Sequence, residues 1–452
     1  MDMKLTETTL KNVDEKLLFE INDSGKYDRD FWTFKNDSKR KYSHLFFNYP
    51  AMMVPAMQSE LIDIIIKVQK NVKNVVDPFV GSGTTMIESM LRGLNFYGQD
   101  INPLAILVCN SKKIPFYKKA LDIKIKLLLK KIASDNKSKI DVNFPNRNKW
   151  FRKDVQKELC VIRRSIMSEP SKWARQFFWV AFAETIRLSS NSRTSTFKLH
   201  IREIEEIEGR EINVVKKFTD ILINNYDNLN LQRDELKSKG YLSKSTYNGK
   251  INIFLKDSSK KIHLMGGKKY DLLISSPPYG DNHTTVTYGQ FSYLPLQWIN
   301  LNDINIKIPI NLLEKITSID SESLGGKKNK SLNAEQLLRK ISPTLSSIID
   351  ELEIKDIEKK PKVVSFFIDL YESLNNSINS LRKDAYMFWT VGNRSVAGIT
   401  IPLDIIMREI IEFIGGKFIL SLSRDICNKR MASRNNTSNT MTKEEILIMR
   451  KT

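Results

Sequence analysis

Cysteine is scarce in this sequence. Its 452 residues include only Cys109, Cys160 and Cys427, which lie far apart and are odd in number. This pattern excludes a disulfide framework and lacks the closely spaced pairs of a zinc knuckle. We therefore expect the protein in a reducing compartment, the cytoplasm.

The sequence also lacks a membrane-spanning segment. No run of about 18 apolar residues occurs, and the start, MDMKLTETTLKNVDEKLLFE, has neither the basic flank nor the apolar stretch of a signal peptide. Histidine is rare, and His44, His200, His263 and His283 do not form the i, i+4 pair of a zinc-binding helix. The sequence thus predicts no membrane association and no metal site.

Acidic residues are outnumbered by basic ones. Lys and Arg total 72 against 52 for Asp and Glu, so the formal net charge is +20. A field of this sign attracts polyanions and speeds their encounter, and nucleic acid is the obvious polyanion. A lysine-rich surface is equally explained by solvation, so charge by itself does not establish a nucleic-acid partner.

The strand and helix patterns indicate an α/β protein. Residues 73–79 (KNVVDPF) predict a short apolar strand, residues 84–91 a helix, and residues 95–99 a second strand that ends at Asp100. Strand, loop, helix and strand in this order predict a parallel unit of an open, doubly wound, mostly parallel sheet. Further strand patterns, which complete the sheet from distant segments, occur at 251–255, 270–275 and 385–391.

A glycine-rich turn, DPFVGSGTT at residues 77–85, joins the first strand to its helix. Gly81 and Gly83 permit close approach of the backbone to a ligand. The turn lacks the Lys of a phosphate-binding P-loop and the full G-x-G-x-x-G spacing of dinucleotide binders. Asp100 stands where an acid can accept both hydroxyls of a ribose, so turn and acid together indicate an adenosine-bearing cofactor. Taken singly, the turn can be an ordinary tight turn and Asp100 a helix N-cap before Pro103.

A second motif, SSPPYG at residues 275–280, directly follows the apolar strand YDLLIS. Pro277 and Pro278 stiffen the backbone and end the sheet pairing. An exocyclic amine of cytosine or adenine is a poor nucleophile because its lone pair is delocalised into the ring. Acceptors aimed at its hydrogens, the Ser276 hydroxyl and the Pro277 carbonyl, can draw it towards tetrahedral geometry. Tyr279 offers a ring face to a base flipped out of a duplex.

DPFVGSGTT, GQDINPLA and SSPPYG together resemble the motifs of DNA amino-methyltransferases from restriction–modification systems. The resemblance brackets most of residues 42–440. It implies S-adenosylmethionine as cofactor and double-stranded DNA as substrate, and it leaves room for a cognate restriction endonuclease as partner. It implies catalytic roles for Ser276, Pro277, Pro278 and Tyr279, and cofactor contacts from Pro55, Asp77, Phe79, Gly81, Gly83, Thr84, Asp100 and Asp257.

The same resemblance implies which part of the cofactor each of these residues contacts. The loop from Phe79 to Thr84 cradles it, Asp77 lies near its methionine part, and Asp100 binds the ribose. Asp257, in INIFLKDSS, resembles the acid that meets the adenine ring, and Pro55 resembles a contact to the methionine carboxylate.

Changes in composition along the chain predict its domain organisation. Residues 112–250 are Lys-rich with long helical periodicity, which predicts a largely helical insertion for DNA binding or target recognition. Residues 301–360 are polar, with a flexible tip predicted at 324–330, and are a second candidate for DNA contact. The catalytic domain takes the remainder: its N-terminal part with the cofactor motifs at 1–111, its continuation at 251–300 and its C-terminal part at 361–452.

The acceptor atom follows from the first position of the S-P-P-Y motif. Ser276 there resembles the cytosine-N4 subgroup, whereas Asp or Asn is more typical of adenine-N6 enzymes, which are the alternative. Cytosine C5 chemistry is disfavoured because it needs a thiolate after a proline, and no cysteine follows one. RNA guanine-N2 methyltransferases carry similar motifs, and a catalytically inactive DNA-binding regulatory module can retain the fold, so both readings stay open.

Overall fold

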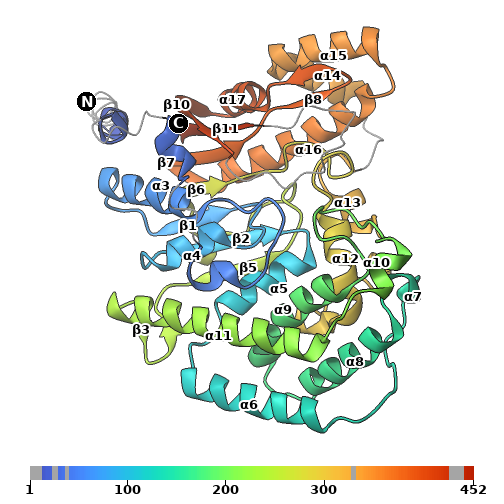
Figure 1. Cartoon of the computed structure of the whole chain (residues 1–452). Helices are drawn as coiled ribbons and strands as arrows, with labels where there is room; N and C mark the ends of the chain where they lie inside the picture. The colour runs from blue at the N-terminus through green and yellow to red at the C-terminus, as the bar shows by residue number, and fades with distance from the viewer. Residues whose placement is uncertain (1–12, 23–28, 36–39, 327–331, 427–441) are drawn as a thin grey trace.

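The computed structural model describes residues 13–22, 29–35, 40–326, 332–426 and 442–452. At its centre lies a seven-stranded sheet (Figure 1). In spatial order its strands are β10 (Gly416–Asp425), β11 (Lys443–Lys451), β7 (Leu381–Val391), β6 (Tyr270–Ser275), β1 (Asn74–Asp77), β2 (Asn95–Asp100) and β5 (Ile251–Leu255). The strands predicted from the N-terminal and central motifs are therefore all present.

The sheet is mostly parallel and doubly wound, which confirms the predicted fold class. Each pairing from β5 across to β7 is parallel, whereas β11 runs antiparallel to both β7 and β10. The chain moves outward from β1 to β2 and β5, then returns to β6 and moves outward to β7 on the other side. Strand order thus reverses between β1 and β6, and ligands of such sheets bind outside the carboxyl ends of the strands at this reversal.

Alternate side chains of the central strands enter two separate hydrophobic layers. Val75 of β1 and Phe96 of β2 face one layer, and their neighbours Val76 and Tyr97 face the other. A strand buried on both faces needs a continuous apolar run, which explains why YDLLIS at 270–275 is buried throughout.

The first layer is built mainly from the N-terminal half of the chain (Figure 1). None of the helices in the described ranges is both long and apolar enough to cross a membrane. Helices of this layer are α3 (Pro55–Val68), α4 (Thr84–Met90), α5 (Pro103–Lys112), α6 (Lys118–Ser134), α7 (Arg147–Trp150), α8 (Lys153–Met167), α9 (Lys172–Ser189), α11 (Val214–Ser238) and α12 (Tyr288–Trp298). Shorter elements nearby are α2 (Arg29–Thr33), α10 (Ile204–Glu208) and the hairpin β3 (Leu242–Ser243) with β4 (Thr246–Tyr247).

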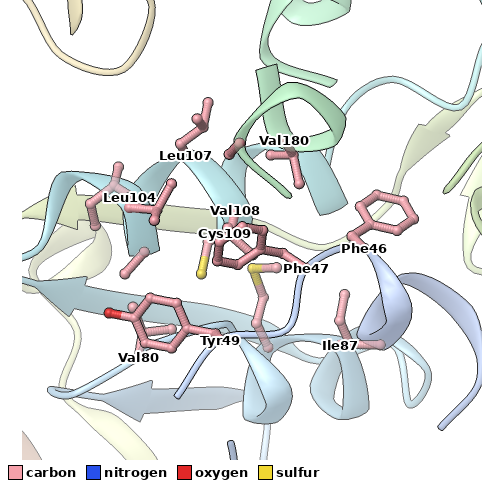
Figure 2. Close-up of a cluster of buried hydrophobic side chains, with 14 of the residues drawn as sticks. Phe46, Phe47, Tyr49, Val80, Ile87, Leu104, Leu107, Val108, Cys109 and Val180 are labelled. Carbon is pink, nitrogen blue, oxygen red and sulfur yellow. The ribbon is translucent and has the colours of Figure 1, made fainter. Parts of the chain in front are cut away.

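The helices between 118 and 238 share one hydrophobic core with the sheet. Helix α9 packs on α5, which in turn packs on β2 and β5. Figure 2 shows this packing, with Val180 of α9 on the same side of α5 as Leu107 and Val108. The helical stretch is consequently positioned against the cofactor motifs by apolar packing, and not by a linker.

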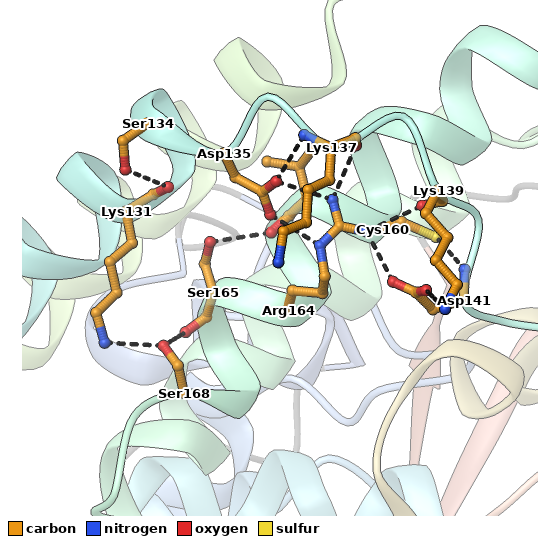
Figure 3. A network of polar contacts seen from close by, with 11 residues as sticks. Lys131, Ser134, Asp135, Lys137, Lys139, Asp141, Cys160, Arg164, Ser165 and Ser168 are labelled. Carbon is orange, nitrogen blue, oxygen red and sulfur yellow. Dashed lines mark hydrogen bonds and ion pairs between the residues drawn. The ribbon is translucent and has the colours of Figure 1, made fainter.

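A single arginine ties the connection between α6 and α7 to helix α8 (Figure 3). Arg164 binds Asp135 at 2.8 Å and Asp141 at 2.7 Å, and also donates to the carbonyls of Lys137 and Lys139. These charge-assisted bonds raise the pKa of Arg164. They order a polar segment that has few apolar side chains of its own.

The second layer comes from the C-terminal half and covers the other face of the sheet (Figure 1). Residues 301–360 contribute more structure to it than their polar composition indicates. Leu338, Leu345 and Ile349 are completely buried because each helix there exposes one polar face and buries one apolar face. The elements of this layer are α14 (Leu332–Ile341), α15 (Pro343–Lys355), α16 (Lys360–Asn379), β8 (Arg394–Val396), β9 (Ile399–Ile401) and α17 (Leu403–Phe413). The short helix α13 (Ser318–Glu322) instead packs on α12 and buries Ile319 in the first layer.

Some sequence predictions fall beyond the described residues. Most of the predicted tip at 324–330, from Lys327 onward, lies outside them, as does Cys427. The two described cysteines, Cys109 and Cys160, are buried and free.

Candidate active site

A cleft opens at the carboxyl ends of β1, β2, β5 and β6, where strand order reverses. The glycine-rich turn forms one wall through Phe79, Gly81 and Thr84, and the S-P-P-Y segment contributes Ser276 and Pro278. Asp100 and Asp257, at the ends of β2 and β5, also line it. The two sequence motifs therefore share one cleft, although almost 200 residues separate them along the chain.

Asp77 joins the two motifs from beneath the cleft. It ends β1, is fully buried, and its Oδ1 accepts from the backbone N–H of Phe79 at 3.0 Å and from the Ser275 hydroxyl at 2.6 Å. Burial raises the pKa of this carboxyl to about 7, partly offset by those hydrogen bonds. Asp77 is not among the lining residues, so the structure gives it a bracing position between β1 and β6.

The glycine-rich turn is held by contacts from helix α5. Lys112 is buried and donates from Nζ to the Ser82 carbonyl at 2.6 Å, and burial lowers its pKa to about 8. Gly83 has φ +79°, and a Cβ there would lie 2.9 Å from Cys109 Sγ. Glycine is required at this position because the conformation is left-handed and the space is filled. Gly83 itself is not part of the lining.

Asp100 keeps hydrogen-bonding capacity for a ligand. Its Oδ2 accepts from the Gly81 N–H at 2.9 Å and its Oδ1 from the Asn102 N–H at 2.8 Å. A carboxylate has about four lone-pair directions, so capacity for a further donor remains. Burial raises its pKa to about 6. The N-cap of α5 is Asn102, whose side chain accepts from Leu104 N–H, which removes the alternative that Asp100 serves as that cap.

Asp257, just after the neighbouring strand β5, also retains hydrogen-bonding capacity. Its two carboxylate oxygens accept from the backbone N–H and the hydroxyl of Ser259, each at 2.8 Å. Gln99 donates to the carbonyl of Asp257 at 3.3 Å and so links the end of β2 to the segment after β5. Both predicted acids are thereby fixed towards the same space.

The S-P-P-Y segment divides its side chains between the cleft and the protein interior. Ser276 and Pro278 line the cleft, while Pro277 and Tyr279 do not. The Tyr279 hydroxyl lies 3.2 Å from Ser276 Oγ and donates to Glu444 Oε1 of β11 at 2.9 Å. Tyr279 is thus directed away from the cofactor end, towards the edge of the sheet.

The segment after Tyr279 is anchored by ion pairs. Asp281 is buried and contacts Lys362 Nζ of α16 at 2.8 Å and Arg394 Nη1 of β8 at 3.5 Å, and these cations lower its pKa. A Cβ at Gly280 would lie 1.7 Å from Arg394 Nη1. Any side chain at residue 280 would therefore displace the arginine that holds the segment.

Several aromatic and apolar residues that line the cleft were not predicted from the sequence. Tyr49 and Tyr288 stack with ring centroids 5.8 Å apart, and Asn102 donates to the Tyr49 hydroxyl at 3.0 Å. The segment from Tyr49 to Met53 lines the cleft, whereas the predicted Pro55 begins α3 and does not. The sequence YPAMMVP could have indicated that Tyr49 lines the cleft, but no motif around Tyr288 indicated a position there.

The lining fits an adenosine-bearing sulfonium cofactor. Two carboxylates with free lone pairs suit ribose hydroxyls and an adenine amine, and Phe79, Met52 and Pro278 supply apolar surface. The carboxylates also favour a positively charged group. The doubly wound fold by itself is shared with dinucleotide-binding proteins, but the glycine-rich turn, the two strand-end acids and the S-P-P-Y segment in one cleft at the reversal point indicate the class of S-adenosylmethionine-dependent methyltransferases.

Comparison with known proteins narrows the class to a family. The family model described as DNA methylase, N6_N4_Mtase, matches residues 2–110. The chain is 33% identical over 454 residues to the type II methyltransferase M.MvaI of Kocuria varians, covering 96% of each protein. It is 25% identical over 173 residues to the type II methyltransferase M.MjaII of Methanocaldococcus jannaschii, covering 38% of this chain and 28% of that protein.

The chain belongs to the DNA amino-methyltransferases of restriction–modification systems, as the motifs predicted. Its activity is methylation of an amino group in DNA, and the family implies S-adenosylmethionine as the methyl donor. Among solved structures, the rRNA methyltransferase aviRa from Streptomyces viridochromogenes aligns with a TM-score of 0.33 and 11% identity, over 91% of this chain and 94% of its own.

Proposed function

We propose that the protein methylates the exocyclic N4 amine of cytosine at a specific site in double-stranded DNA. The observation that carries this proposal is the position of Ser276, a neutral hydroxyl at the first position of S-P-P-Y, in the same cleft as the glycine-rich turn and Asp100. Bound S-adenosylmethionine supplies an electrophilic methyl group there. All further contributions come from residues of the chain.

Residues of the turn and the strand ends hold the cofactor in this proposal. Asp100 accepts the ribose hydroxyls, Asp257 accepts from the adenine amine, and Phe79 covers the ligand. The backbone at Gly81 and the helix start at Thr84 contact it closely because Gly83 keeps the turn left-handed. Asp77 positions the turn relative to Ser275, and Pro55 positions the lining segment that precedes it.

Residues of the S-P-P-Y segment activate the amine. The Ser276 hydroxyl and the Pro277 carbonyl accept its two hydrogens, which raises the electron density on N4, and Pro278 keeps both acceptors rigid. The target cytosine must leave the duplex to reach them, so we infer base flipping. Tyr288, which lines the cleft, supplies aromatic surface beside the extruded base, and Tyr279 acts through its contact with Ser276.

Target recognition falls to surfaces outside the cleft. We assign it to residues 112–250, whose helix α9 packs on α5, and to residues 301–360, whose helix α13 lines the cleft. Since DNA is the substrate, we infer a cytoplasmic location, and a restriction endonuclease that cuts the same site is the expected partner.

Identification of the methylated nucleoside tests the proposal. The purified protein is incubated with S-adenosylmethionine and plasmid DNA, and the digested nucleosides are analysed by mass spectrometry. We expect N4-methylcytosine. N6-methyladenine would replace the proposal with the adenine alternative, and single-molecule sequencing of the same DNA would give the recognised site.

A further inference from the structure

A series of hydrogen bonds leads from the cleft to a carboxylate on β11, the strand next to the edge strand β10. Ser276 Oγ, which lines the cleft, lies 3.2 Å from the Tyr279 hydroxyl, and that hydroxyl donates to Glu444 Oε1 at 2.9 Å. Glu444 belongs to β11, 165 residues further along the chain. Because Tyr279 donates to the carboxylate, its oxygen is left to accept the Ser276 proton.

We propose that Ser276, Tyr279 and Glu444 form a proton-transfer chain that removes the proton released by the target amine. The inference rests on the proposed role of Ser276 at that amine, and it does not depend on whether the base is cytosine or adenine. Glu444 acts through Tyr279 and is a positioning residue in this scheme.

The proton balance of the step is complete without another reactant. A bond forms between the amine nitrogen and the methyl carbon, the bond from that carbon to sulfur breaks, and its electron pair stays on sulfur. The methylated nitrogen gives one proton to Ser276 Oγ. Ser276 passes its own proton to Tyr279, and Tyr279 passes its own to Glu444, which becomes a neutral carboxylic acid.

A terminal acceptor is needed because neither hydroxyl can keep the proton. Neutral serine and tyrosine hydroxyls are very weak bases, whereas a carboxylate holds a proton readily. Burial, with Glu444 nearby, raises the pKa of Tyr279 well above its usual value, so the phenol remains a donor. Before the reaction, Tyr279 therefore carries the proton that it must pass to Glu444.

Other charged groups face Glu444 and keep its orientation. Arg424 of β10 donates from Nη1 to Glu444 Oε2 at 2.7 Å and from Nε to the carbonyl of Trp32 at 3.0 Å. The second titratable neighbour is Tyr288 at the start of α12, whose pKa is raised in part by Glu444. Arg424 therefore leaves Oε1 directed at Tyr279, the oxygen that receives the proton.

Substitutions can separate this role from aromatic contact with the base. Tyr279→Phe keeps the ring and removes the hydroxyl, and Glu444→Gln keeps an acceptor for Tyr279 and removes the basic carboxylate. We expect each to slow methyl transfer about a hundredfold, the usual scale of acid–base assistance, with unchanged KM for DNA and cofactor. Glu445→Gln is the matched control, because Glu445 is the next residue of β11 and binds Ser421 and Ser423 on the far edge.

The pH profile supplies a readout that a purely structural role would not move. At saturating cofactor, kcat of the wild type should fall as the pH is lowered, because a protonated Glu444 cannot accept. Glu444→Gln should lack this decline, and Glu445→Gln should retain it.

Each outcome bears on the proposal. Wild-type kcat in Tyr279→Phe, or an unaltered acid limb in Glu444→Gln, would overturn it. If Glu444→Gln does not fold, the kcat of Tyr279→Phe and its pH profile still decide. The methylated nucleoside is identified in the same reactions, so N6-methyladenine would reject the cytosine assignment while leaving the proton-transfer chain to be judged by its own rates.

Discussion

At the scale of the residue, two buried carboxyl groups near the cleft, those of Asp77 and Asp100, have different surroundings. Asp77 and Asp100 both have pKa values raised by burial, to about 7 and about 6, yet only Asp100 lines the cleft. Asp77 accepts from Phe79 and Ser275 through Oδ1, beneath the cleft. A raised pKa therefore accompanies a bracing position for Asp77 and a position facing the cleft for Asp100.

Asp100 gives a prediction about cofactor affinity and pH. Its folded-state pKa of about 6 lies above the usual 3.8, so the protonated form accumulates as the pH falls through 6. A protonated carboxyl accepts fewer ribose hydroxyls, and the Kd for S-adenosylmethionine should rise up to about tenfold per pH unit below 6. Isothermal titration calorimetry from pH 8 to pH 5 measures this.

Two variants test whether the pH dependence of cofactor binding comes from Asp100. Asp100→Asn should bind the cofactor weakly at every pH and lose the dependence, whereas Asp122→Asn, on exposed α6, should keep the wild-type profile. The same shift affects folding: the Asp100 contribution to stability decreases as the pH rises from about 4 to about 6 and is constant above. A Kd independent of pH in the wild type would contradict the assignment of Asp100.

At the scale of the element, short helix α13 fixes the start of α12. Asp320 is completely buried and accepts from the backbone N–H groups of Gly289 at 2.8 Å and Gln290 at 3.1 Å. A carboxylate at this end also favours the helix dipole. Because Ile319 and Glu322 of α13 line the cleft, this one contact relates the 301–360 segment to the site.

Removing that contact should be measurable in stability and in binding. Asp320→Ala leaves two helix N–H groups without their acceptor and should lower the free energy of unfolding by about 1–2 kcal/mol. Cofactor affinity should fall as well, because α13 would no longer be held over the cleft. Urea denaturation and calorimetry test both effects, and Asp320→Asn, which keeps one acceptor, should be intermediate. Unchanged stability in Asp320→Ala would show that α13 is held in place by other contacts.

At the scale of the whole molecule, two helical layers enclose the sheet and leave its carboxyl edge open. The first layer extends through α9 and α11 in one core, and the second is formed by α14 to α17 (Figure 1). The full sequence carries a formal net charge of +20. For a family that acts on DNA, such a charge supports contacts with phosphates.

Salt dependence of DNA binding tests this electrostatic contribution. If about six phosphates are contacted, the affinity should fall roughly a thousandfold between 50 and 200 mM salt. Fluorescence anisotropy with a labelled duplex gives the slope of log K against log salt. A slope near zero would assign the lysines to solvation of the surface, the alternative that composition alone left open.

The sequence by itself determined the local chemistry of this protein. The strand, turn and helix of residues 73–91, the acid at 100 and the rigid S-P-P-Y segment could be predicted because each depends on neighbouring residues: apolar periodicity, glycine conformation and proline geometry. Those motifs also predicted the family. Helices α14 to α16 were not predicted, since the amphipathic pattern of 332–379 was obscured by its many polar residues.

Only the tertiary structure decided which of these residues meet. Hydrogen bonds such as Ser275 to Asp77 and Tyr279 to Glu444 join residues 198 and 165 positions apart, and no local pattern encodes their partners. Strand order across the sheet brings them together, and that order is set by burial of both faces. The same long-range packing placed Tyr49 and Tyr288 in the cleft and turned Tyr279 towards β11.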